Sequence, residues 1–181
     1  AAKHEHLLAA APFVQAQAML SFGQAVRGAV VRGIVPNQED KVADFRPHMK
    51  SGDLDALRPD SFQIVLGSEL ARALGVFVGD RVTLIAPQGV VTPAGVVPRL
   101  KTFTVGGLFE VGMYEYDSGL ALIHLADAQR LYRMDDRVSG VRLKLDDLFV
   151  APRVARSLAS TLATDAYISD WTRSHANFFR A

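Results

Sequence analysis

The side chains that could bind a metal or perform catalysis are few and scattered. His4 and His6 flank Glu5, a spacing that places both imidazoles on one side of an extended segment. A zinc site requires at least three protein ligands, and no third candidate stands nearby in the sequence. We therefore expect a solvated terminus here, with no metal site.

Nucleophilic catalysis has no recognisable arrangement either. The remaining histidines, His48, His124 and His175, belong to no motif that would join them to a serine and an aspartate. Gly67-Ser68-Glu69 lacks the Gly-x-Ser-x-Gly pattern of a nucleophile elbow and is instead typical of the start of a helix. The sequence contains no Gly-x-x-x-x-Gly-Lys-Ser/Thr loop of the P-loop ATPases. It thus predicts no catalytic residues and no cofactor.

The adjacent acidic residues have a structural explanation as well. Asp135-Asp136 and Asp146-Asp147 each stand at the boundary of a predicted element, where aspartate commonly caps a helix or turns the chain. Asp117-Ser118-Gly119 likewise predicts a turn. Gly106-Gly107 lacks the strand–turn–helix setting of a dinucleotide-binding loop, and we interpret it as a bend or bulge in a strand. None of these groups predicts chemistry.

Composition excludes several classes of protein. The 181 residues have a formal net charge of +1, whereas a nucleic-acid-binding protein would need a basic excess. The absence of cysteine rules out disulfides and thiolate sites. With 49% hydrophobic and 22% charged residues, a packed core is expected. No stretch reaches the roughly 18–20 apolar residues of a membrane-spanning helix, and the abrupt ends fit a segment of a longer protein.

The hydrophobic pattern predicts a mixture of strands and helices. Alternation predicts paired strands over 13–22 and 25–35 around a turn at Gly23. Further strands are expected over 61–66, 81–85, 100–111, 119–123, 138–145 and 167–168. Helices are expected over 1–10, 37–46, 68–74, 127–133, 151–162 and 170–180. Loops are expected over 47–59 and 87–98. Ser68 and Asp127 are the predicted N-caps of their helices. The order indicates an α+β fold in which a β-rich insertion, residues 61–117, interrupts the outer segments.

The loop predicted over 87–98 does not have the composition of an ordinary surface loop. Prolines and glycines punctuate it, so it is not expected inside a sheet, yet it contains four valines and no charge. Two interpretations follow: the valines form a contact site for a partner on a proline-stiffened projection, or they fold back onto their own domain. In the first case Arg99 and Lys101 would add electrostatic steering. The turn predicted at 113–116 also combines apolar and aromatic side chains.

Several short motifs, in the order in which they occur, resemble the periplasmic domains of a known family. Three are similar to MacB-type ABC permeases in general: Gly67-Ser68-Glu69-Leu70-Ala71, Leu74-Gly75-Val76 and Gly79-Asp80-Arg81-Val82. The others resemble more specifically the lipoprotein-releasing Lol permeases, LolC and LolE: Pro93-x-Gly95-x-x-Pro98, Phe103-Thr104-Val105-Gly106-Gly107, Leu125-Ala126-Asp127-Ala128-Gln129, Val138-Ser139-Gly140-Val141 and Trp171. The resemblance covers nearly the whole chain.

This resemblance implies a fold of two subdomains. Residues 1–60 and 118–181 would form a mixed α/β porter-like subdomain. Residues 61–117 would form a β-rich, Sabre-like subdomain that carries a projecting loop, residues 87–101. Membrane-spanning helices would flank the chain in the full protein, which would lie in the bacterial inner membrane with this domain in the periplasm.

The resemblance also implies a role in transport without catalysis. A permease of this family works with a cytoplasmic ABC ATPase and a second permease subunit, identical or paralogous. Together they extract lipoproteins from the inner membrane and pass them to the periplasmic chaperone LolA. The LolC-type subunit holds LolA with a projecting loop, the Hook, to which residues 93–98 and their flanks are similar. Its shape would be set by Pro93, Gly95 and Pro98, its contacts made by Val96 and Val97, and its charge supplied by Arg99 and Lys101.

Alternatives remain within and beyond this family. The Hook resembles LolC, whereas residues 138–145 are as similar to LolE, so the type of permease stays open. A MacB- or FtsX-like permease domain that transmits motion for other cargo would usually lack the Pro-x-Gly-x-x-Pro loop. An unrecognised periplasmic enzyme would have no membrane-spanning segments on either side of this chain.

Overall fold

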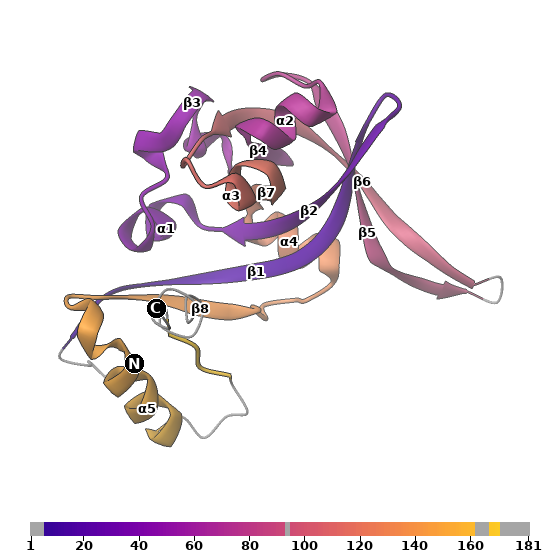
Figure 1. Cartoon of the computed structure of the whole chain (residues 1–181). Coiled ribbons are helices and arrows are strands. Elements are labelled where there is room, and N and C mark those ends of the chain that lie inside the picture. The colour runs from indigo at the N-terminus through magenta and orange to yellow at the C-terminus, as the bar shows by residue number, and fades with distance from the viewer. Residues whose placement is uncertain (1–5, 93–94, 162–166, 171–181) are drawn as a thin grey trace, which may run out of the picture. The chain divides into compact units, whose positions relative to one another are not determined.

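The computed structural model describes residues 6–92, 95–161 and 167–170, and it contains both helices and strands (Figure 1). The strands are β1 (Leu7–Phe22), β2 (Ala25–Ile34), β3 (Met49–Gly52), β4 (Gln63–Gly67), β5 (Arg81–Thr92), β6 (Gly95–Phe109), β7 (Leu120–His124) and β8 (Gly140–Leu145). The α-helices are α1 (Pro36–Val42), α2 (Ser68–Leu74), α3 (Tyr114–Gly119), α4 (Leu125–Tyr132) and α5 (Ala151–Thr161). None of the helices in this described part is long and apolar enough to cross a membrane. The predicted α+β class is confirmed.

The chain divides into two compact units. The larger is formed by residues 10–142, and the smaller by residues 1–9 together with 143–181. These bounds differ from those of the predicted insertion at 61–117. The division into a porter-like and a Sabre-like subdomain stays a prediction.

Among the described residues of the larger unit, six strands pair in a closed ring. Along the ring, β1 pairs antiparallel with β2, β2 parallel with β7, β7 antiparallel with β4, β4 parallel with β6, β6 antiparallel with β5, and β5 antiparallel with β1. Strand β3 adds to β6, and β8 lies beside β1. Because closure leaves the paired stretches without free edges, the ring forms a stable base for segments that extend beyond it.

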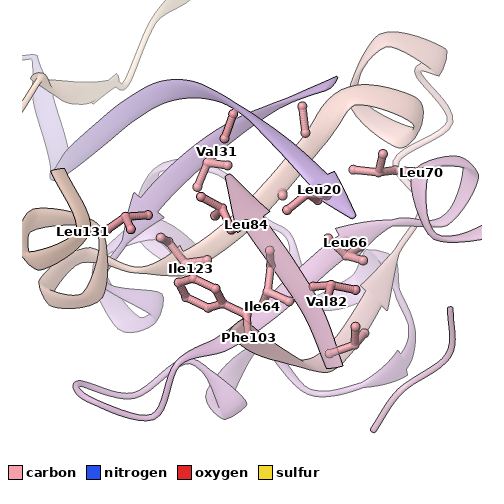
Figure 2. Packing of buried hydrophobic residues seen from close by; sticks show 14 of the residues in the cluster. Leu20, Val31, Ile64, Leu66, Leu70, Val82, Leu84, Phe103, Ile123 and Leu131 are labelled. Atoms are coloured by element: carbon pink, nitrogen blue, oxygen red, sulfur yellow. The ribbon is translucent and has the colours of Figure 1, made fainter. Parts of the chain in front are cut away.

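Alternating residues of these strands separate into two hydrophobic cores. Ile64 and Leu66 of β4 belong to one core and Val65 to the other, because successive side chains of a strand point to opposite faces. The main core receives side chains from all six strands of the ring and from α2 and α4. Figure 2 labels ten of its residues: Leu20, Val31, Ile64, Leu66, Leu70, Val82, Leu84, Phe103, Ile123 and Leu131. Since burying one side chain of this size stabilises the fold by about 1.5–3 kcal/mol, the core holds the ring together.

The locally encoded elements agree best with the predictions. The hairpin of β1 and β2 is confirmed, with Phe22 paired to Ala25 and with Gly23 at a φ of +57° in the turn. Gly75, with a φ of +75°, ends α2 as expected. Strands predicted over 61–66, 119–123 and 138–145 and helices over 37–46 and 151–162 correspond to β4, β7, β8, α1 and α5.

The helix predicted over residues 1–10 is wrong where the chain is described, because residues 7–10 belong to β1. Its alanines favour a helix in isolation. The neighbouring strand offers backbone partners instead, since Asp146 N donates to His6 O (3.1 Å) and Ser139 N donates to Phe13 O (2.9 Å). Strand pairing therefore outweighed local propensity.

Both predicted N-caps are wrong. Gly67 occupies the cap position of α2, and the Ser68 hydroxyl is buried inside the first turn without a hydrogen-bond partner among the described residues. Helix α4 begins two residues before Asp127, and the His124 Nδ1 accepts its capping hydrogen bond from Ala126 N (3.2 Å). The Asp127 carboxylate instead accepts hydrogen bonds from the backbone amides of Asp60 and Phe62.

Three other predictions change. The loop expected over 47–59 contains β3 and short 3-10 turns at 46–48 and 54–56. The turns expected at 113–116 and 117–119 belong largely to α3. Residues 167–168 form no strand, and the last helix, predicted over 170–180, lies outside the described residues apart from its first position.

Candidate functional site

The side chains that the sequence offered for chemistry make structural hydrogen bonds. His6 Nδ1 lies 3.1 Å from Asp146 Oδ1, while His4 and Glu5 lie outside the described residues. Asp147 accepts a hydrogen bond from the Phe149 amide (2.8 Å). Within the described ranges, no three His, Cys, Asp or Glu side chains gather closely enough to hold a metal ion. The feature that distinguishes the larger unit is instead an extension of β5 and β6.

Strands β5 and β6 continue beyond the ring as a two-stranded arm, formed by the described residues 87–92 and 95–101; we call the stretch 87–101 the arm. The pairing of β5 with β1 ends at Ile85, and the pairing of β6 with β4 begins at Thr104. Beyond these points the described residues of the two strands pair with each other, and Figure 1 shows them leaving the rest of the unit side by side. The loop predicted over 87–98 is therefore wrong in its backbone, because its described residues belong to two antiparallel strands.

A bulge explains how two strands accommodate these prolines. Ala86 pairs with Arg99 and Val90 with Val97, so residues 87–89 lie opposite Pro98 alone. Proline donates no backbone hydrogen bond, and a bulge is a place where none is needed. Gly89 is required there, because a Cβ at this position would lie 1.9 Å from the carbonyl oxygen of Val97. The bulge thus accommodates the prolines and glycines whose presence had predicted a loop at this position.

The described part of the arm exposes apolar surface. Gly95, with a φ of +120°, pairs with Thr92, and Pro93 lies outside the described residues. Val96 pairs with Val91. The Val97 side chain is 54% exposed and that of Leu100 is 63% exposed. Val97 is therefore not buried against its own domain.

The two basic residues predicted to supply charge are engaged at the base of the arm. Arg99 Nη1 donates to the Leu131 carbonyl oxygen (3.0 Å) in the last turn of α4. Such carbonyls have no partner within their own helix, and a cation is favoured there by the helix dipole. Lys101 Nζ lies 3.6 Å from the centre of the Phe62 ring, a cation–π contact. Both charges are held in place by their own unit.

Phe62 and Asp127 complete this base, and sequence reasoning did not identify either. Phe62 has a φ of +48°, a region that bulky residues rarely adopt. The buried Asp127 carboxylate accepts hydrogen bonds from the backbone amides of Asp60 (2.8 Å) and Phe62 (3.1 Å). Burial raises the pKa of Asp127, and these two amides oppose the rise. The residues are far apart in sequence, so no local pattern could have joined them.

A hollow on the surface adjoins the base of the arm. It is lined by Ser61, Phe62, Arg81, Leu100, Lys101, Thr102 and Thr104. Two of these side chains are cations and three are hydroxyls. Residues 81–109, which include the whole arm, contain three basic side chains and no acidic one. The arm therefore combines exposed apolar groups with a positively charged base.

Known proteins show the same sequence pattern. The family of MacB-like periplasmic core domains matches residues 2–161. The lipoprotein-releasing system transmembrane protein LolC of Neisseria meningitidis serogroup B is 48% identical, over 97% of this chain and 42% of that protein. LolC of Xylella fastidiosa is 49% identical, over 94% of this chain and 41% of that protein. The chain thus spans less than half the length of these relatives, and the resemblance to Lol permeases is confirmed.

Solved structures agree on the fold. The periplasmic region of MacB from Actinobacillus actinomycetemcomitans superposes with a TM-score of 0.61 at 14% identity, covering 99% of this chain and 79% of that one. The extracellular domain of the ABC-type transporter YknZ from Gram-positive bacteria gives a TM-score of 0.56 at 11% identity, over 87% of this chain and 77% of that one. At such low identity these similarities establish the fold alone.

Proposed function

Because the chain belongs to the family of MacB-like periplasmic core domains, we propose that it is the periplasmic domain of a lipoprotein-releasing ABC permease of the LolC/LolE type. The identity of nearly half to the LolC relatives supports this assignment. The full permease would lie in the bacterial inner membrane beside a second permease subunit. A cytoplasmic ATPase would supply the energy, and lipoproteins would be the cargo. This domain would bind and transmit motion, with no catalysis of its own.

We further propose that the arm, residues 87–101, docks the periplasmic chaperone LolA in the manner of a Hook. The observation that carries this proposal is the projecting pair of strands with the exposed Val97 on it. Residues bound by a ladder lose less entropy on docking than residues of a free loop. The outer edges of the two strands are also suited to pairing with a strand of a partner.

The charge of the arm supports the same proposal. The stretch 81–109 contains three basic residues, Arg81, Arg99 and Lys101, and no acidic one. A surface of this kind attracts an acidic partner over a distance of about one Debye length, roughly 8 Å at physiological salt. Apolar contact by the arm and electrostatic steering by its base would then act together.

Substitution of Val97 by Asp tests the docking role. Complete burial of a valine contributes about 1.5–3 kcal/mol, and a carboxylate in its place would bring an unpaired charge into the contact. We therefore expect V97D to weaken binding of LolA to this chain by at least about tenfold in isothermal titration calorimetry. Because the base of the arm is positively charged, binding by the wild type should also weaken as the salt concentration rises.

Val141 provides a matched control. It lies on β8 of the same unit and is exposed to the same extent as Val97, 54%. V141D introduces the same charge on a strand surface away from the arm, and it should leave the affinity for LolA unchanged. Equal affinities of V97D and the wild type, or equal losses in V97D and V141D, would contradict docking through the arm.

A further inference from the structure

Helix α4 contacts the base of the arm in two places. Arg99 donates to the Leu131 carbonyl oxygen, and Lys101 rests on the ring of Phe62, whose amide is held by Asp127. Arg99 and Lys101 are two residues apart in β6 and so project from the same face of the strand. The two attachment points belong to the same helix: the backbone carbonyl of Leu131 at the end of α4 and, through Phe62, the side chain of Asp127 about one turn earlier. One helix therefore supports one side of the arm.

Residues 60–62, which precede β4, can support Lys101 only if their backbone conformation is fixed. Asp60 and Phe62 have φ values of +62° and +48°, and such a conformation costs a non-glycine residue about 1–3 kcal/mol. It persists only where the surroundings fix it. Here both oxygens of one buried carboxylate accept the amides of these two residues, and the Phe62 carbonyl accepts a hydrogen bond from Thr104 N (3.0 Å).

The ring of Phe62 is fixed by further contacts. It meets Phe103 of the main core edge to face, with centroids 5.8 Å apart and an interplanar angle of 73°. Lys101 Nζ lies over the same ring. If the Phe62 backbone relaxed to an ordinary φ, the ring would leave the position beneath Lys101. The carboxylate of Asp127 is thus connected to the arm through a single aromatic side chain.

We propose that Asp127 is a positioning residue for the arm. Its carboxylate holds the backbone of Phe62, so that the Phe62 ring supports Lys101. Together with the Arg99–Leu131 hydrogen bond, this contact fixes the base of the arm to α4. The importance of this positioning for LolA rests on the proposed docking function. The positioning itself does not, because it concerns the direction and order of the arm. Arg99, which the sequence suggested as a contact for the partner, becomes part of the attachment.

The test compares Asp127→Asn with Asp117→Asn in the 181-residue chain. Asparagine keeps the size of the side chain and one acceptor, but its amide group would meet the second backbone N–H with another donor. Asp117 is an equivalent control, since its buried carboxylate accepts the amides of Val111 (2.8 Å) and Gly112 (3.0 Å). It also lies beside Gly67, at the opposite end of β4 from Phe62. Both variants should lose stability to a similar degree.

Two readouts separate positioning from stability. In backbone amide NMR spectra, D127N should shift and broaden the signals of residues 99–101 and 62, whereas D117N should leave these signals in place. D127N should also weaken LolA binding, by about tenfold if the correctly placed arm falls to about a tenth of the molecules, and D117N should not. Unchanged arm signals in D127N, or the same changes in both variants, would overturn the positioning role.

A Phe62→Gly variant keeps the proposal testable if D127N folds poorly. Glycine adopts a positive φ without strain but removes the ring. The signals of residues 99–101 should therefore shift and broaden as in D127N, while the hydrogen bonds from the backbone to Asp127 remain. Arm signals in F62G that match those of the wild type would overturn the chain of contacts through Phe62. If the wild type fails to bind LolA, the docking proposal fails, and the NMR comparison still decides the positioning role.

Discussion

The ion pair between the buried Glu39 and the half-buried Arg142 gives the sharpest prediction for stability. Glu39 of α1 is fully buried, with 0% of its surface exposed, and Arg142 Nη1 of β8 donates to its Oε1. Its Oε2 has no hydrogen-bond partner among the described residues. Burial raises the pKa of Glu39, and the positive charges of Arg142 and Arg32 oppose this rise. Arg142 thus compensates a carboxylate that has little other support.

Replacement of Arg142 by Met would remove the hydrogen bond to that carboxylate and the larger of the two positive influences on it, leaving that of Arg32. Removing one partner of a buried pair costs about 3–5 kcal/mol. For a chain of this size each kcal/mol lowers the melting temperature by about 2–4 °C, so R142M should melt on the order of 10 °C below the wild type. In a Glu39→Gln background no buried carboxylate remains, and R142M should cost only about 1 kcal/mol, the value of an ordinary hydrogen bond.

The pH dependence of the same pair has a defined sign. Because the pKa of Glu39 is raised above 4.5 in the folded state, the folded protein holds a proton that the unfolded protein has released. The contribution of Glu39 to stability is therefore greatest below pH 4.5 and falls as the pH rises through the folded pKa. In R142M the fall should extend to higher pH, because only Arg32 still opposes the rise of the Glu39 pKa. The fall should be absent from E39Q.

Urea unfolding followed by circular dichroism measures these differences for the wild type, R142M, E39Q and the double variant, at about pH 5 and pH 7. At the higher pH, the loss of unfolding free energy caused by R142M should be several-fold larger in the wild-type background than in the E39Q background. An equal loss in both backgrounds would refute the reasoning, since the lost interaction would then be unrelated to the buried carboxylate.

Two further predictions concern the arm and the start of α4. Gly89→Ala should disrupt the bulge and weaken LolA binding. The melting temperature should change little, because the added Cβ meets only residues of the arm. Gly28→Ala, at a strand position with open space around the added Cβ, should change neither the affinity nor the melting temperature. Burial lowers the pKa of His124 below 6.5, so its contribution to stability is present above pH 6.5 and is lost as the pH falls through the lowered folded pKa. His124→Asn should keep the helix cap and remove the loss of unfolding free energy at low pH. Urea unfolding between about pH 5 and pH 7 measures this difference. A pH profile of stability equal to that of the wild type would contradict the role of His124.

The parts of the fold that could be predicted from the sequence are those whose signals are local. Alternation and a single turn glycine were sufficient for the β1–β2 hairpin, because its two strands are adjacent in the chain. The alanine-rich start was predicted as a helix because the strand it pairs with lies far along the chain, where Asp146 N donates to His6 O. Pairing at such a distance leaves no mark on local composition.

Alternation predicted the strand at 138–145 but did not reveal which of its side chains turns inward. Val141 is 54% exposed, whereas Arg142 turns toward the buried Glu39. An arginine on the inner side of a strand is acceptable only where a carboxylate receives it. Glu39 precedes Arg142 by 103 residues, so the partner could not be inferred from spacing.

For the candidate site, the sequence indicated the segment and missed its structure. The unusual combination of valines, prolines and glycines correctly marked residues 87–98 as distinctive. Those prolines and glycines predicted a loop, since the bulge that allows Gly89 and Pro98 within paired strands depends on the register of the opposite strand. Asp127 was interpreted as a helix cap because its true partners, the amides of residues 60 and 62, lie on a distant segment.

The most direct test of docking through the arm maps the contact of LolA on this chain residue by residue. Unlabelled LolA is titrated into the isotope-labelled chain, and the backbone amide signals are followed by NMR. We predict that the largest changes fall on the arm, residues 87–101, and that V97D abolishes them. Changes confined to other surfaces, such as β8 or α3, with the arm signals unmoved, would contradict this role of the arm.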